Sequence, residues 1–239
     1  MRTQNKLTSQ LNYLLGGAQV DAVWDGIRRA EPLHEKAARV RHALADAARS
    51  YDWPQVFDII SENKELVNVS RLGGLSLYAP LHQAAHSGAS VAVAQRLIDM
   101  GAWRTLQNSR GERPVDVADR QGHRHLLGVL APKCKHNVPL GVLLKIQALF
   151  HDVIRGRIDR ELRDHGLRLP ELEPLLELDR PQMWFPVPGM YGGLSYRLDQ
   201  TGVDARLVSE SWSRVVGGSG QRISLHRWAA NCLRNPRCS

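Results

Sequence analysis

In the second half of the chain, one run of apolar residues has the spacing of a helix. Its members follow one another at steps of three or four residues, which places them on one helical face. They are Leu143, Ile146, Phe150, Ile154, Ile158 and Leu162. The pattern predicts an amphipathic helix that ends near His165 and Gly166, because glycine commonly closes a helix.

Strand spacing appears farther along the chain. Leu194–Leu198 alternates apolar and polar residues, and Ala205–Val216 is predicted as a second strand. The turn-forming residues of Asp199–Gly202 lie between them. We therefore predict a small β-hairpin or meander that packs on the preceding helix.

The first half of the chain contains a repeated pattern. Pro80–Ala85 reads Pro-Leu-His-Gln-Ala-Ala, and Pro114–Ala118, which starts 34 residues later, reads Pro-Val-Asp-Val-Ala. A degenerate copy, Leu44–Arg49 followed by Trp53–Ile60, precedes both. Proline suits the first turn of a helix, where its missing N–H would have no partner, and Gly88 can end such a helix with a positive φ. The sequence thus predicts successive pairs of short helices.

This pattern resembles the ankyrin repeat, whose hallmark is T-P-L-H-x-A-A-x-x-G-H. The resemblance covers Ala43–Leu130, and the middle unit carries it best although Ala79 replaces the family's threonine. In the third unit Pro-Val-Asp replaces Pro-Leu-His, a departure common in a terminal unit that exposes a polar face. The resemblance implies that His82 braces the turn between repeats. It also implies that the stack binds partners through its finger tips and its concave helical face.

These segments predict a mainly α fold: a short ankyrin-like helical solenoid with N-terminal capping helices, followed by a small α+β C-terminal region. Val20–Ile27 and Leu33–His42 are the expected capping helices, separated at Pro32. Met1–Ser9 is expected to be disordered. The predicted parts are the N-terminal tail and capping helices (1–42), the repeats (43–130), a linker (131–139), the α+β region (140–222) and a divergent or disordered tail (223–239).

The tail, Ile223–Ser239, differs in composition from the rest of the chain. No acidic residue follows Glu210, and Leu225, Trp228 and Leu233 share one poorly defined helical face. We interpret the tail as divergent or disordered, with a docking helix as the alternative. In the first two cases it lacks the apolar area to offset its ordering entropy, so deleting it would leave the melting temperature nearly unchanged.

Composition and charge restrict the possible classes of protein. Of the 239 residues, 43% are hydrophobic and 23% charged, and the formal net charge is +8, which permits acidic partners without identifying them. No apolar run reaches the roughly 18 residues of a membrane span, and the polar start is unlike a secretory signal. The 3 cysteines are too few and scattered for a disulfide framework. We expect a cytoplasmic protein.

Three other kinds of site can be weighed from the residues. His123-x-His125 with Cys134-x-His136 supplies zinc-type ligands, but His123 already matches the repeat and the spacing of one suits a helix poorly, so no cofactor is predicted. The chain lacks a nucleophile elbow and a phosphate-binding loop. Ser219, between two glycines, is interpreted as part of a loop, and the carboxylates of the proline-rich stretch, Glu171 and Glu173, are expected to be solvated.

Nucleic acid is a further class of partner. Along the helix that contains Arg155 and Arg163, arginines alternate with Asp and Glu, which is typical of a solvated, salt-bridged surface rather than a phosphate-binding one. Trp184 and Phe185 could stack on bases, but the prolines and glycines around them favour a packing role.

The candidate partner-binding residues lie in the finger between the second and third units. Tryptophan and arginine dominate binding hot spots because they combine large area with directional contacts. The candidates are Trp103, Arg104, Asn108, Arg110 and Arg113. We predict a protein–protein interaction scaffold whose partner is another protein; the alternatives are that Trp103 only packs on the next repeat, and that the repeats deliver an enzymatic C-terminal region to a substrate.

Overall fold

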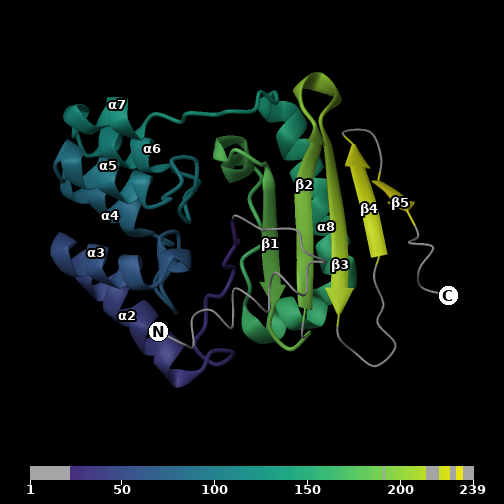
Figure 1. The fold of residues 1–239 in the computed structure, drawn as a ribbon, viewed down its shortest axis with the longest axis horizontal. Coiled ribbons are helices and arrows are strands. Elements are labelled where there is room, and N and C mark those ends of the chain that lie inside the picture. The colour runs from purple at the N-terminus through teal and green to yellow at the C-terminus, as the bar shows by residue number, and fades with distance from the viewer. Residues whose placement is uncertain (1–21, 191, 214–220, 227–229, 234–239) are drawn as a thin grey trace.

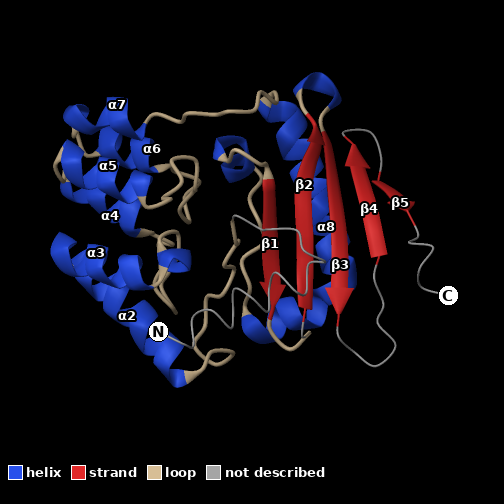
Figure 2. Ribbon diagram, in the orientation of Figure 1, coloured by secondary structure: helices blue, strands red, loops and turns tan. Residues whose placement is uncertain are grey.

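The computed structural model describes residues 22–190, 192–213, 221–226 and 230–233, and it has two structural parts (Figure 1). Short helices form the first part, and a long helix behind an antiparallel sheet forms the second (Figure 2). The fold is therefore mixed: helices occupy the N-terminal half, and the strands come after them. The predicted disorder of Met1–Ser9 falls outside the described residues.

Three helix pairs follow one another along the first part. They are α2 (Glu35–Arg49) with α3 (Trp53–Glu62), α4 (Pro80–Ser87) with α5 (Val91–Asp99), and α6 (Pro114–Arg120) with α7 (Leu127–Leu130). Short 3-10 turns lie at Lys64–Leu66 and Arg124–Leu126. One hydrophobic core joins the pairs, and Ala84 and Ala85 are fully buried in it, as their small size predicts.

The helices α4 and α6, which start 34 residues apart at Pro80 and Pro114, are capped at their first turns by different side chains. The N–H of Ala79 donates to Nδ1 of His82 over 3.4 Å, and the N–H of Arg113 donates to the Asp116 carboxylate over 2.8 Å. Both satisfy a backbone donor at a helix start, so Asp116 replaces His82 without loss of the cap. His82 is fully buried, and its Nε2 also donates to the carbonyl of Glu112 over 3.3 Å, so the predicted bracing role is confirmed.

The segment before α2 is extended, so the predicted helix at Val20–Ile27 is wrong over its described residues. Val23 forms a parallel bridge with Trp184, and the N–H of Trp24 donates to the Trp184 carbonyl over 2.8 Å. At Gly26 a Cβ would lie 2.5 Å from a backbone oxygen, so the chain passes there too closely for a side chain. The expected second capping helix, Leu33–His42, is instead the beginning of α2.

The second part is built on α8 (Leu140–His165), which confirms the amphipathic helix and its end at Gly166, where φ is +56°. Its backbone leaves the helical region at Ile158. The turn η3 (Glu173–Glu177) then leads into the sheet. Across the helix–sheet interface, the rings of Phe150 and Tyr196 lie 5.1 Å apart.

The sheet is an antiparallel meander in the order β1-β2-β3-β4-β5. Its strands are β1 (Gln182–Val187), β2 (Gly192–Gln200), β3 (Arg206–Ser213), β4 (Gln221–His226) and β5 (Ala230–Leu233), with the turn η4 (Gly202–Asp204) between β2 and β3. Two of these strands were predicted, β2 at Leu194–Leu198 and β3 at Ala205–Val216, whose last three residues fall outside the described ones, whereas β1, β4 and β5 were not. Pro186 is tolerated in β1 because β1 is an edge strand of the sheet. Trp184 and Phe185 are buried, in agreement with a packing role.

The expectation of a divergent or disordered tail is wrong for the described residues after position 222. Leu225 lies opposite Leu207 of β3 and is fully buried, and Ile223 belongs to the same core. Ile223 and Leu225 alternate with polar residues, a strand pattern that the composition of the tail obscures.

Truncation at residue 222 is therefore expected to destabilise the protein. Removing Ile223–Ser239 takes two core side chains from the sheet, and losing one buried leucine alone typically costs about 2–5 kcal/mol. We expect the melting temperature to fall by more than about 5 °C in thermal unfolding followed by circular dichroism. A truncation that removes only residues 234–239 is the control, and equal melting temperatures for both truncations would contradict the packing of β4.

Burial also makes His82 a source of pH-dependent stability. Desolvation lowers its pKa from 6.5 to about 4, since its Nδ1 accepts a backbone N–H and its ring has no contact with water. The unfolded chain then binds the proton more tightly, so stability is complete above pH 6.5 and falls as the pH approaches 4. The full effect is about 3 kcal/mol.

Chemical denaturation of the wild type and of His82→Gln between pH 7.5 and 4.5 measures this linkage. The carboxylates are the same in both proteins, so the difference between the two curves isolates the imidazole. We expect the wild type to lose its advantage as the solution is acidified. A difference that stays constant with pH would contradict the buried, neutral histidine.

Candidate functional site

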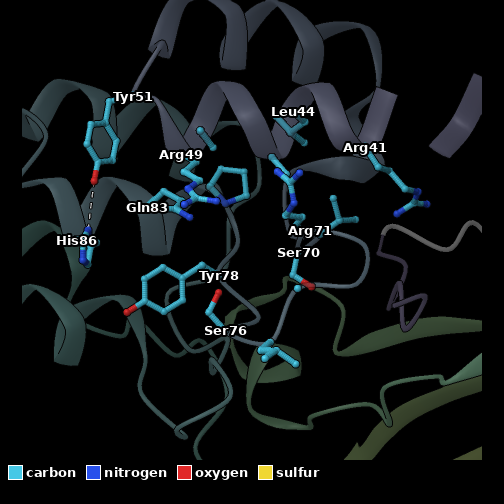
Figure 3. Close-up of a pocket in the computed structure, with 16 residues that line it drawn as sticks. Arg41, Leu44, Arg49, Tyr51, Ser70, Arg71, Ser76, Tyr78, Gln83 and His86 are labelled. Carbon is cyan, nitrogen blue, oxygen red and sulfur yellow. Dashed lines mark hydrogen bonds between the residues drawn. The ribbon is translucent and has the colours of Figure 1, made fainter. Parts of the chain in front are cut away.

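A groove runs along the inner helices of the first part. We call the segment at positions 67–79 the first finger and the segment at positions 101–113 the second finger. A cavity of about 470 Å³ lies between α2, α4 and the first finger, and a second one of about 380 Å³ continues it toward the second finger and α6. Leu75, Ser76, Tyr78 and His86 border both cavities, so the two form one continuous groove. Figure 3 shows the helix and finger side chains facing the same space.

Cations line this groove, and no carboxylate is among its lining residues. The basic lining residues are Arg41, Arg49, Arg71, His86, Arg110 and Arg120. Three of these arginines form ion pairs with acidic residues that do not line the groove. Arg41 pairs with Asp25 over 2.5 Å, Arg71 pairs with Asp46, and Arg120 pairs with Glu112 over 2.8 Å.

Two of these carboxylates, Asp46 and Glu112, have lowered pKa values. The hydrogen bond from Arg71 lowers the pKa of Asp46, and hydrogen bonds from Asn108 and Arg120 lower that of Glu112. By contrast, Arg49 and Arg110 are exposed and form no ion pair with any residue that the structure describes. The surplus positive charge of the groove therefore resides on these two side chains.

Tyr51 borders the groove in an unusual backbone conformation. It follows α2 with φ at +62°, whereas Gly88 and Gly122 occupy the corresponding left-handed position after α4 and α6. A residue with a Cβ is strained there by about 1–2 kcal/mol. The Tyr51 hydroxyl lies 3.3 Å from Nδ1 of His86, the contact marked in Figure 3, and its ring stacks on Trp53. This strained backbone conformation places the Tyr51 ring at the rim of the groove.

Leu75 is the most exposed large apolar side chain of the described residues. It lies in the first finger with 85% of its surface accessible, and it borders both cavities. Sequence reasoning missed Leu75 and Tyr51. The signal for Tyr51 was available, because an aromatic residue stands after the first helix where the other pairs carry glycine.

Four of the five predicted finger residues are engaged inside the chain. Trp103 is buried and stacks on Trp24, with ring centroids 6.0 Å apart and planes inclined by 3°. The Arg104 guanidinium donates to the carbonyl of Val129 over 3.0 Å, and Arg113 pairs with Glu173.

The remaining two candidates lie at the turn of the second finger. The buried Asn108 side chain shapes this turn by accepting the N–H groups of Arg110 and Glu112 over 2.7 and 3.0 Å. Arg110 is the predicted residue that is exposed at the groove. Trp103 packs on Trp24 of the N-terminal segment and belongs to the core between α8 and the sheet, which we call the second core.

The acidic residues of the proline-rich stretch hold the second finger, so the expectation that they are solvated is wrong. Glu177 accepts the N–H groups of Arg104 and Thr105 over 3.1 and 2.8 Å and the Thr105 hydroxyl over 2.6 Å. Glu171 accepts the N–H of Gln107 over 3.0 Å. Burial raises the pKa of Glu171 and of Glu173, although arginines beside them act in the opposite direction.

The side chains considered as metal ligands lie against backbone carbonyls. Nε2 of His123, His125 and His136 lies within 3.2 Å of the carbonyls of His86, Ala89 and Leu178, while Cys134 is exposed. Within the described ranges, no group of three or more His, Cys, Asp or Glu could hold a metal ion. None of the helices described has the length and apolarity needed to cross a membrane.

Comparisons with known proteins give little beyond this geometry. No protein-family model matches the chain, and no curated protein matches it. Among solved structures, the chain is similar to one chain of a structure described as a predatory endopeptidase from Bdellovibrio bacteriovorus in complex with an immunity protein. The match has a TM-score of 0.32 and 26% identity, and it covers 37% of this chain and 43% of that one. The matched part is thus less than half of that chain.

Substitutions at Tyr51 test its backbone strain. Glycine and alanine both remove the ring, but only glycine adopts a positive φ without steric cost. We expect Tyr51→Gly to be more stable than Tyr51→Ala by about 1 kcal/mol in urea unfolding. At Arg39, an exposed position inside α2, the same comparison should favour alanine, since glycine is the poorer helix former. Alanine favoured at both positions would contradict the left-handed conformation.

Proposed function

We propose that the three helix pairs form an ankyrin-like stack and that the chain is a protein–protein interaction scaffold. Its partner is a segment of another protein, bound in the groove between the inner helices and the first finger. The observation that carries this proposal is the exposed Leu75, which borders both cavities of the groove, together with the strained Tyr51, which borders the first. Tyrosine and arginine, which line the same hollow as this leucine, are among the residues enriched in binding hot spots.

The position of the binding surface differs from the one expected for a stack with free fingers. The second finger packs against the second core with Trp103 and Leu106, and its backbone donors meet Glu171 and Glu177. A partner that bound the buried face of this finger would have to displace those contacts. The groove requires no such displacement, and Arg110 still borders it. We therefore place the partner along the groove and not on the finger tip.

Strain at Tyr51 supports the same assignment. Glycine at this position would remove the steric cost at no loss to the helix end, as it does after α4. Residues held in unfavourable backbone regions gather at functional sites because their side chains are needed in one direction. Here that direction is toward His86 and the groove.

Replacing Leu75 tests the proposal. Leu75→Asp puts a charge at the residue that borders both cavities, and it should abolish partner capture when the immobilised chain is exposed to an extract of its source cells. Leu144→Asp is the matched control, because Leu144 is also exposed, at 49%, but lies on α8 outside the groove.

The readout is mass spectrometry of the retained proteins. We expect a protein that is retained by the wild type and by Leu144→Asp and lost by Leu75→Asp. Melting curves for the three proteins check that each is folded. If all three retain the same proteins to the same extent, the groove is not the binding surface.

A further inference from the structure

We infer that the groove selects an acidic segment, one in which carboxylates flank a large apolar side chain. This inference rests on the proposed function and adds the chemistry of the partner. It follows from which charges of the groove are compensated within the chain and which are left for a ligand.

The compensated charges are those of Arg41, Arg71 and Arg120. Each has a carboxylate of the chain as its ion-pair partner, and none of those carboxylates lines the groove. An anion in the groove could therefore contact these guanidinium groups without repulsion from a lining carboxylate. The Arg120 guanidinium is also fixed by the Tyr78 hydroxyl at 3.1 Å, so it is oriented before any ligand arrives.

The charges without an ion pair of their own among the described residues are those of Arg49 and Arg110. Each acts on a carboxylate that already pairs with another arginine, Asp46 with Arg71 and Glu112 with Arg120, so positive charge is in excess along the groove. Arg49 borders the cavity beside α2, and Arg110 borders the one beside the second finger. While the groove is open, water solvates both side chains. A bound segment would cover them, and a buried cation without a partner is costly. A segment with carboxylates at both ends restores the lost solvation, whereas a neutral or basic one does not.

The apolar part of the ligand is set by what lies between these two cations. Leu75 and Tyr78 border both cavities, and Tyr51 borders the one that contains Arg49. A leucine, phenylalanine or similar side chain would cover the exposed surface of Leu75, which gains free energy in proportion to the area removed from water. The ligand pattern is therefore acidic, apolar, acidic.

A protein segment fits this pattern better than a nucleic acid does. Binding to phosphates relies on many cations and on aromatic rings that stack on bases. The groove offers the excess charge of two arginines, and an exposed leucine borders both of its cavities. The arginines of α8 do not add to it, because Arg155, Arg160 and Arg163 pair with carboxylates of their own helix.

Selection from a random twelve-residue peptide library displayed on phage tests the inference without knowledge of the natural partner. The full chain is the bait, and clones are counted on the wild type, on Arg49→Glu with Arg110→Glu, and on the control Arg124→Glu. Arg124 is exposed on the same stack, outside the groove, and forms no ion pair with a described residue. One enriched peptide is then synthesised with a fluorescent label for anisotropy titrations.

We expect the enriched clones to be rich in Asp and Glu around an apolar residue. The double charge reversal should lower the affinity for the labelled peptide by about tenfold or more, whereas Arg124→Glu should leave that affinity unchanged. Adding NaCl to 300 mM should lower the affinity of the wild type for the peptide. A labelled twelve-nucleotide oligothymidylate is titrated in parallel and should bind more weakly than the peptide.

The other outcomes separate the two claims. Enriched peptides that are neutral or basic, and that Leu75→Asp no longer binds, would overturn the acidic preference and leave the groove as a binding site. Tighter binding of the oligonucleotide than of any peptide would also overturn it. No enrichment at all, or enrichment that neither Leu75→Asp nor the charge reversal reduces, would overturn the proposed function itself.

Discussion

A carboxylate that is partly withdrawn from water is costly unless donors meet it, and in this protein the donors come from a distant part of the chain. Glu177 takes three hydrogen bonds from the second finger, and Glu171 takes one more. The same finger contributes Trp103 and Leu106 to the core beneath the sheet. The second finger therefore connects the two cores of the molecule, the one among the helix pairs and the one between α8 and the sheet.

This connection determines which surfaces of the helix pairs stay accessible. A stack with free fingers offers both its finger tips and its concave helices, but here the second finger supplies its ring and its backbone donors to the chain itself. What stays accessible is the groove, with Leu75 bordering both of its cavities and Tyr51 held in a costly conformation at its rim. The second finger thus packs inside the chain with Trp103, while Arg110 of the same finger borders the groove.

Features with a local cause could be predicted from the sequence. The apolar spacing of α8, the caps that begin with Pro80 and Pro114, and the left-handed Gly88 depend on neighbouring residues and were predicted correctly. Features that depend on remote partners were not. The segment at Trp24 is extended because β1 offers it hydrogen bonds, and β1 tolerates Pro186 because it is an edge strand.

The same distinction applies to the candidate site. Arg110 was predicted and borders the groove, while Trp103 was chosen for its chemistry, without knowledge that Trp24 would cover it. Likewise, nothing near Glu177 in the sequence indicates that the second finger will bring three donors to it.

Stacks of helix pairs ordinarily change length by duplication, because each pair contacts only its neighbours. Here the first pair is held by Asp25 on Arg41 and the second finger by Glu177, so an inserted pair would force two anchors on one core apart. The surface of the groove can therefore change by substitution of its exposed residues, but not by lengthening the series of helix pairs between those anchors.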